Sequence, residues 1–93
     1  MSTTKVALIT GSGKRRVGNA VATALADRGY NIALHYNRSA EEAQQTVAQL
    51  EQKGVRAAAF QADVAEEADV ERLFGETLAF FGRLDVLVTA AAV

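Results

Sequence analysis

The sequence predicts an α/β protein built on a doubly wound parallel sheet, and two observations lead to this prediction. Four short apolar runs alternate with three segments in which apolar residues recur at helical spacing. Strands that are joined by single helices must run parallel, with right-handed crossovers. The runs are also apolar throughout instead of alternating with polar residues, which is typical of strands that are covered on both faces.

The predicted elements follow one another in a regular β-α-β-α-β-α-β order with short connections. The predicted strands are residues 6–9, 30–36, 55–61 and 84–89. The first helix should begin near Val17, the second at Ser39 with Glu42 completing a capping box, and the third at Glu66. The predicted helix stops are Gly29, Gly54 and Gly82.

The apolar residues of each helix predict which face packs on the sheet. For the first helix these residues are Val17, Ala20, Val21, Ala24 and Leu25. For the second helix they are Ala43, Val47 and Leu50. For the third helix they are Val70, Leu73, Phe74, Thr77, Leu78 and Phe81.

Composition and charge exclude several classes of partner. Ten basic residues against eleven acidic residues give a net charge of −1, which favours neither nucleic acid nor a membrane surface. The chain has no cysteine, which fits a reducing compartment, and no cluster of metal ligands is apparent. The apolar run near the N-terminus is too short for a signal peptide or a membrane span. We therefore expect a cytoplasmic protein without a metal.

The most informative segment is the glycine-rich stretch of residues 10–18 (TGSGKRRVG), between the first strand and the first helix. Its backbone N–H groups and the helix N-terminus would face one point, which suits a phosphate. The glycine spacing departs from G-x-G-x-x-G, and the lysine is not followed by Ser or Thr as in a Walker A loop. Taken alone, the stretch could also be an ordinary glycine-containing loop. The candidate phosphate-binding residues are Gly11, Ser12, Lys14, Arg15 and Arg16.

Four motifs together resemble the short-chain dehydrogenase/reductase family. They are Thr10-Gly11, residues 35–39 (HYNRS), Asp63-Val64 and residues 84–88 (LDVLV), in the family's order and spacing. The resemblance covers essentially the whole chain and is closest to the pteridine-reductase and 3-oxoacyl-reductase types. It implies a Rossmann-like sheet with strand order 3-2-1-4. It also implies hydride transfer between a nicotinamide dinucleotide and a carbonyl or pterin-like substrate.

The resemblance assigns roles to individual residues. Gly11 would let the pyrophosphate approach, and Val17 would lie under the cofactor at the helix start. Asp63 would accept a hydrogen bond from the adenine amino group, although it could instead cap the following helix. The remaining contacts, a backbone contact to adenine and packing on the adenosine ribose, would come from Val64, Ala90 and Ala91.

Charge predicts that the cofactor is NADP(H). No acidic residue lies between Tyr30 and Ala40, where a site for NAD would place a carboxylate. The segment offers Asn37, Arg38 and Ser39 instead, and these suit a 2′-phosphate. The alternative is that Arg38 is a solvated charge after the strand and that Ser39 only caps the following helix. Arg15 or Arg16 would assist from the glycine-rich loop. We favour Arg16, which aligns with the family pattern when counted back from Gly18.

The family's catalytic Ser, Tyr and Lys have no counterpart here and are expected beyond residue 93. Tyr30 and Tyr36 have no lysine four residues on, and the single histidine, His35, is expected to be a packed or hydrogen-bonded residue. The family's Asn-Asn-Ala-Gly turn after the fourth strand is replaced by residues 89–92 (TAAA). The missing amides and glycine affect the cofactor contacts expected at that end.

The fourth strand should form an exposed apolar edge, so the predicted sheet is incomplete there. We expect residues 1–93 to be the N-terminal part of a single dinucleotide-binding domain. The rest of the reductase, in the same or a companion chain, would dock on this edge, and the complete protein would form a homotetramer. One alternative is a stand-alone NADP(H)-binding or sensing module without turnover. A flavodoxin- or receiver-like domain without a dinucleotide ranks last, because receiver domains gather acidic residues at the strand ends and here Asp63 is the only one.

Overall fold

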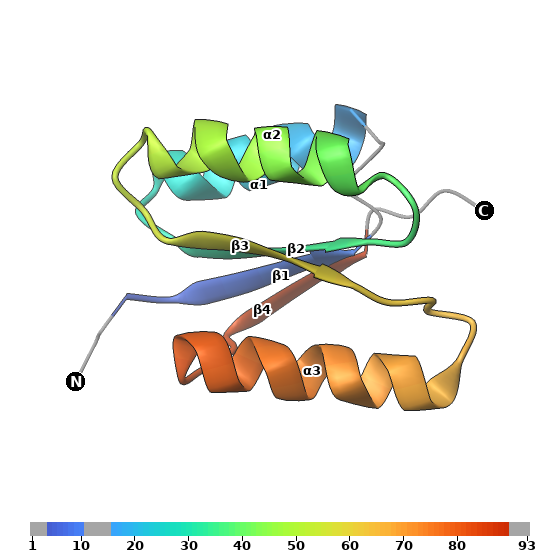
Figure 1. Cartoon of the computed structure of the whole chain (residues 1–93). Coiled ribbons are helices and arrows are strands. Elements are labelled where there is room, and N and C mark those ends of the chain that lie inside the picture. The colour runs from blue at the N-terminus through green and yellow to red at the C-terminus, as the bar shows by residue number, and fades with distance from the viewer. Residues whose placement is uncertain (1–3, 11–15, 90–93) are drawn as a thin grey trace.

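The computed structural model describes residues 4–10 and 16–89, with residues 16–18 described as backbone only. It contains the predicted alternation of strands and helices (Figure 1). The elements are β1 (Val6–Thr10), α1 (Arg16–Asp27), β2 (Asn31–Tyr36), α2 (Ala40–Glu51), β3 (Ala57–Gln61), α3 (Glu67–Phe81) and β4 (Val86–Thr89). The predicted strand boundaries agree with the structure to within two residues at every strand end.

The four strands form one parallel sheet in the order β3-β2-β1-β4, as predicted. Helices α1 and α2 cover one face of the sheet and α3 covers the other (Figure 1). A single helix connects each strand to the next, and the two faces are filled alternately by successive residues of β1. Residues Ala7 and Ile9 pack toward α1 and α2, whereas Val6 and Leu8 pack toward α3. The apolar sequence of β1 is thus explained by burial on both faces.

The core is densest around the central strands β1 and β2. The side chains of Leu8, Ile9, Ile32 and Leu34 have no measurable solvent exposure. On the α3 side the core includes Leu73 and Phe81. Removing this much apolar surface from water is the main stabilising contribution to the fold. The two central strands are therefore the most deeply buried part of the sheet.

The predicted sheet-facing side of α1 is partly wrong. Ala22 and Ala26 are buried and Val21 and Leu25 pack beside them, but Ala20 and Ala24 are exposed. Ala20 and Ala24 lie on one side of this helix and Ala22 and Ala26 on the opposite side, so the apolar spacing does not define a single buried face. For α2 the predicted face is confirmed, since Ala43, Val47 and Leu50 are buried. For α3 Leu73, Thr77 and Phe81 are buried, while Leu78 is 47% exposed.

The helix ends also differ from the predictions in detail. Ser39 is the N-cap of α2, but its side chain makes no capping hydrogen bond, so the predicted capping box is wrong. Its backbone, at φ −98° and ψ 57°, lies outside the extended region that aims an N-cap hydroxyl at the helix N–H groups. Gly82 does end α3 in the left-handed conformation, with φ 82°, and donates its N–H to the carbonyl of Leu78 at 2.8 Å. Helix α2 ends at Glu51, before the predicted stop at Gly54.

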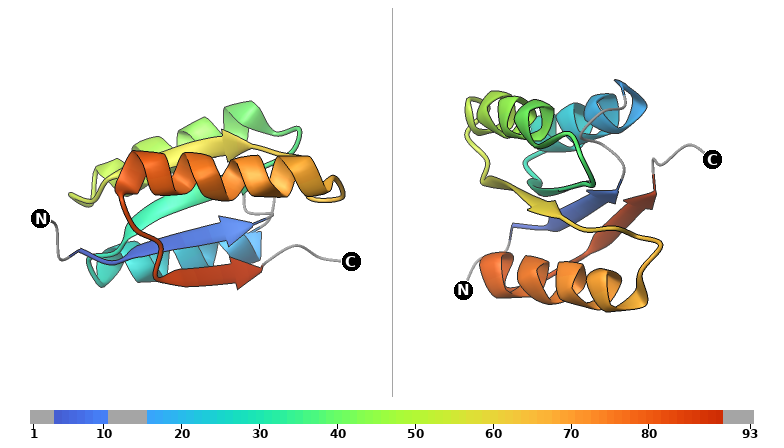
Figure 2. Two further views of the ribbon diagram at one scale, coloured as in Figure 1. Left: turned by 90° about the horizontal axis from the view of Figure 1, so that it is seen from below. Right: turned by 45° about the vertical axis from the view of Figure 1, so that its right-hand side comes forward.

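Strand β4 forms one edge of the described sheet, as predicted. In the left view of Figure 2, α3 lies over the neighbouring strands and β4 lies to one side of it. Val86 and Val88 pack on the core beside α1, whereas Leu87 faces the other side and is 51% exposed. An apolar side chain exposed on an edge strand is a position where a further element can pack.

The start of β4 is tied to the start of β1 by Asp85. Its carboxylate oxygen Oδ2 accepts the N–H of Val6 at 2.8 Å, and its own N–H donates to the Val6 carbonyl at 2.9 Å. Arg83 donates to both carboxylate oxygens, at 2.9 Å and 2.7 Å. The Arg83 hydrogen bonds, followed by the bond from Val6, hold the pKa of Asp85 below its usual range.

This pKa shift predicts a pH-dependent contribution to stability. Asp85 has a lower pKa folded than unfolded, so its contribution is present above the unfolded pKa and disappears as pH falls through the folded pKa. The free energies of unfolding of the wild type and of Asp85→Asn should therefore differ above the unfolded pKa of 3.8 and converge as the pH falls through the lower folded pKa. A series of urea titrations over this acidic range measures the difference, and a difference that does not depend on pH would contradict the prediction.

Candidate functional site

The carboxyl ends of the four parallel strands meet at one edge of the sheet. These ends are Thr10, Tyr36, Gln61 and Thr89. Thr10 and Thr89 are paired in register, and the Thr10 hydroxyl donates to the Val88 carbonyl at 3.5 Å. The strand order reverses here, because β1 is followed by β2 on one side and has β4 on the other. Open α/β sheets bind ligands at such a switch point, outside the carboxyl ends of the strands.

The loop after β2 carries the residues predicted to hold a phosphate. Asn37 and Arg38 are exposed and Ser39 is half-buried. Gln61, at the end of β3, donates from Nε2 to the Asn37 carbonyl at 3.2 Å and to Asn37 Oδ1 at 3.4 Å. Arg38 makes no ion pair with any carboxylate in the described part of the chain. Its guanidinium thus stands at the edge without a described acidic partner.

Backbone and side-chain hydrogen bonds join the loop after β3 to the end of β2. Ala62 donates its N–H to the Tyr36 carbonyl at 3.0 Å and so extends the ladder by one bond. The ring of His35 is 3% exposed, and its Nε2 lies 2.7 Å from the Ala62 carbonyl, to which it donates. The prediction that His35 is a packed, hydrogen-bonded residue is confirmed. The hydrogen bond from His35 on β2 to Ala62 holds the residue after β3 against β2.

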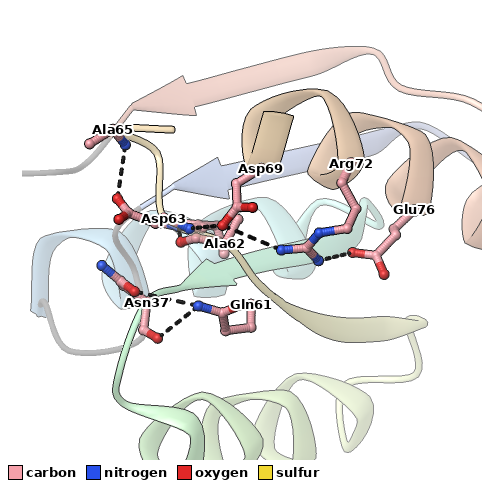
Figure 3. A network of polar contacts seen from close by, with 9 residues as sticks. Asn37, Gln61, Ala62, Asp63, Ala65, Asp69, Arg72 and Glu76 are labelled. Atoms are coloured by element: carbon pink, nitrogen blue, oxygen red, sulfur yellow. Dashed lines mark hydrogen bonds and ion pairs between the residues drawn. The ribbon is translucent and has the colours of Figure 1, made fainter. Parts of the chain in front are cut away.

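Asp63 follows directly at this edge and is half-buried (Figure 3). Its Oδ1 accepts the N–H of Ala65 at 3.0 Å, and its own N–H donates to Asp69 Oδ2 at 2.9 Å. The N-cap of α3 is Glu66, whose N–H donates to the Asp63 carbonyl at 2.9 Å. Asp63 therefore closes the turn before α3 and is not its N-cap, which removes that alternative role. Val64, next to it, is 47% exposed.

A chain of charged side chains on α3 continues from this turn and was not found by sequence reasoning. Asp69 lies 3.5 Å from Arg72, which lies 3.0 Å from Glu76 (Figure 3). The spacing of Asp69, Arg72 and Glu76 could have indicated it, because charges of alternating sign three and four residues apart share one face of a helix. The sequence alone gives Asp69 only a favourable place near a helix N-terminus. Its bond to Asp63 depends on the turn before the helix.

The structure brings the predicted site residues after β2 and β3 together, whereas those of the glycine-rich loop and those after β4 lie outside the described residues. Gly11, Ser12, Lys14, Arg15, Ala90 and Ala91 lie outside the described residues. Arg16 and Val17 form the first turn of α1, and their side chains are not described. The predicted residues after β2 and β3 do share one edge, where Gln61 links them. Within residues 4–10 and 16–89, no cluster of three or more His, Cys, Asp or Glu side chains is arranged to hold a metal ion. No helix in the same residues is long and apolar enough to cross a membrane.

A parallel sheet in the order 3-2-1-4, with helices on both faces, defines a Rossmann-like α/β protein. The sequence profile described as short chain dehydrogenase matches residues 5–93. The chain therefore belongs to the short-chain dehydrogenase family.

Named relatives are reductases. The 3-oxoacyl-[acyl-carrier-protein] reductase FabG of Staphylococcus aureus is 42% identical over 93 residues, which are 100% of this chain and 37% of the relative. A hydroxynaphthalene reductase-like protein of Metarhizium guizhouense is 42% identical over 85 residues, which are 91% of this chain and 32% of the relative. The chain thus spans about a third of the length of these curated relatives.

Solved structures share the fold. A Burkholderia cenocepacia structure with bound NADP superposes with a TM-score of 0.87 at 38% identity and covers 92% of this chain and 33% of its own. An NAD⁺-bound xylitol dehydrogenase superposes with a TM-score of 0.81 at 37% identity, covering 89% of this chain and 31% of its own. Similar structures therefore bind one or the other nicotinamide dinucleotide.

Proposed function

We propose that residues 1–93 are the cofactor-binding part of a short-chain reductase that transfers hydride between NADP(H) and a substrate carbonyl group. The observation that carries this proposal is the pairing of two loops at the carboxyl edge. The loop after β2 offers a guanidinium, an amide and a hydroxyl without a carboxylate. The loop after β3 places a carboxylate beside it, and Gln61 connects the two. The bound dinucleotide would supply the hydride.

The choice of NADP(H) over NAD(H) rests on Asn37, Arg38 and Ser39. Arg38 is exposed and makes no ion pair with a described carboxylate, and residues 37–39 themselves contain no acidic residue. A guanidinium binds a phosphate dianion through short, charge-assisted hydrogen bonds. We propose that Arg38 binds the 2′-phosphate, with Arg16 or Arg15 on the opposite side.

The remaining cofactor contacts follow from the same placement. Asp63 would accept the adenine amino group, and Val64 would contact the ring through its backbone. The first turn of α1, which begins at Arg16, directs its N–H groups outward at the end of the glycine-rich loop. We propose that the pyrophosphate binds there, against Gly11, Ser12 and Lys14. Val17 would lie beneath the cofactor, and Ala90 and Ala91 would pack on the adenosine ribose.

We propose a 3-oxoacyl thioester as the substrate class, supported by the 42% identity to a 3-oxoacyl reductase. A pterin-like substrate is the alternative that the sequence motifs leave open. The catalytic Ser, Tyr and Lys would lie beyond residue 93, in a longer polypeptide or in a companion chain.

The test is cofactor binding and turnover by the complete polypeptide. Isothermal titration with NADPH and NADH should give the smaller Kd for NADPH. Addition of a 3-oxoacyl thioester to the NADPH complex should then oxidise the nicotinamide, which absorbance follows directly. Tighter binding of NADH would overturn the cofactor assignment. Binding of NADPH without oxidation by 3-oxoacyl or pterin substrates would favour a sensing module.

We further propose that the rest of the reductase packs against β4, and Leu87→Ala tests this. If Leu87 is covered in the complete polypeptide, this substitution should cost about 2–4 kcal/mol of unfolding free energy, as for a buried leucine. If Leu87 keeps the exposure that it has in residues 4–89, the cost should stay below about 1 kcal/mol. Urea unfolding of the wild-type complete polypeptide and of its Leu87→Ala variant measures this cost. A cost below about 1 kcal/mol would contradict the proposal.

The complete protein is proposed to be a homotetramer in the cytoplasm. Sedimentation of the complete polypeptide tests its oligomeric state, and a monomer would contradict this part of the proposal.

A further inference from the structure

We infer that Asp69, held by Arg72, is a positioning residue that fixes the orientation of Asp63 for recognition of the adenine amino group. This inference rests on the proposed function, in which Asp63 is the adenine contact. It assigns a role in cofactor selectivity to a side chain that lies six residues away from Asp63 on another element.

The first step of the argument is the bond between the two residues. Asp69 is the third residue of α3, and its Oδ2 accepts the backbone N–H of Asp63 at 2.9 Å. This hydrogen bond has a charged acceptor, so it is stronger than a bond between neutral groups. It crosses from the first turn of the helix to the end of β3 (Figure 3). The orientation of the Asp63 peptide is thereby set by α3.

The second step concerns the Asp63 carboxylate itself. Its Oδ1 accepts the Ala65 N–H at 3.0 Å, which limits rotation of the side chain. Among the contacts of the described residues, none uses its Oδ2. One oxygen is thus occupied by the turn and the other can accept the N–H of an amino group. Hypoxanthine has a carbonyl oxygen where adenine has its amino group, and this oxygen would repel the carboxylate.

The third step is what holds Asp69. One Arg72 nitrogen lies 3.5 Å from Asp69 Oδ2, and the other donates to Glu76 at 3.0 Å. The side chains of Asp69, Arg72 and Glu76 are 32%, 43% and 44% exposed. Ion pairs this exposed contribute little to stability. Their effect is therefore expected on the geometry of the turn, and variants are expected to fold.

Glu67 provides a matched control within the same helical turn. It is acidic and lies in the first turn of α3, as Asp69 does, but it is exposed where Asp69 is half-buried and it makes no hydrogen bond to Asp63. Glu67→Ala and Asp69→Ala remove the same charge from the same helix end. A difference between them reflects the two contacts that Asp69 makes and Glu67 does not, which are the bond to Asp63 and the ion pair with Arg72. Arg72→Gln removes only the second of these contacts. Asp69→Asn is the conservative variant, because its amide oxygen can still accept that bond.

The experiment measures Kd for NADPH and for its hypoxanthine analogue in the complete polypeptide. Asp69→Ala should weaken NADPH binding about three- to tenfold and reduce the preference for adenine over hypoxanthine by about threefold or more. Arg72→Gln should change the preference in the same direction by a smaller factor. Glu67→Ala should leave the preference unchanged, and Asp69→Asn should largely restore it.

Each remaining outcome has a defined meaning. An Asp69→Ala protein with a lower Tm and an unchanged base preference would overturn the inference, since a purely structural role predicts that result. Equal effects of Glu67→Ala and Asp69→Ala would overturn it as well. Asp63→Ala is measured alongside. If it leaves the base preference unchanged, the proposed adenine contact is itself wrong, and the inference fails for that separate reason.

Discussion

Replacing Arg38 with aspartate is expected to weaken NADPH binding about 10- to 100-fold, because a charge-assisted contact to the 2′-phosphate is replaced by repulsion. NADH binding should change much less. The introduced carboxylate can accept the ribose 2′-hydroxyl of NADH, which offsets the loss of the arginine. Isothermal titration of both cofactors to the variant and to the wild type measures the ratio of the two Kd values.

Arg28→Asp is the control for this substitution. Arg28 is also exposed, but it lies in the turn before β2, at the opposite end of that strand. Arg28→Asp changes the net charge by the same amount as Arg38→Asp, but at a position far from the proposed phosphate site. It should therefore leave the ratio of NADPH to NADH affinity unchanged. Equal losses for both cofactors with Arg38→Asp would refute the assignment of Arg38 to the 2′-phosphate.

Shortening Leu34 to alanine is expected to destabilise the protein by about 2–5 kcal/mol. Leu34 lies in the middle of β2, is fully buried, and is paired in register with Ile9 on one side and Ala59 on the other. The two neighbouring strands restrict collapse around the space left by the side chain. Its removal therefore costs both the transfer of the lost methyl groups and the cavity that remains.

Urea unfolding monitored by circular dichroism checks this value, with Gln45→Ala as the control. Gln45 is exposed on α2, and its truncation should change the free energy of unfolding by less than about 0.5 kcal/mol. A cost for Leu34→Ala as small as that of Gln45→Ala would contradict the packing of β2 between two helical layers.

Local sequence patterns were sufficient for the order and type of the elements. The apolar runs around Leu8 and Leu34 indicate strands buried on both faces, and the structure confirms this. Gly82 could be identified as a helix end because the left-handed conformation there favours glycine. The motifs at the strand ends were enough to indicate the family, and parallel pairing places Asn37 and Asp63 at one edge.

The individual side-chain contacts between elements could not be predicted, although the order of the strands could. Alanines around α1 left its rotation undetermined, and packing against the sheet chose Ala22 and Ala26 as the buried residues. The bond from Val6 to Asp85 spans 79 positions and exists only because β4 pairs with β1. The contact from Asp63 to Asp69 depends on the direction in which the turn enters α3.

The sequence by itself therefore determined the class of fold, the order of its elements and the set of candidate cofactor-binding residues. The fold class and the order of the elements follow from apolar spacing and turn residues, which act over a few positions. The candidate residues follow from the family resemblance together with local charge. Only the tertiary structure decided which face of α1 is buried, that the Ser39 side chain does not cap α2, and which side chain holds Asp63. Hydrogen bonds and packing depend on distance and direction in space, which neighbouring residues alone do not specify.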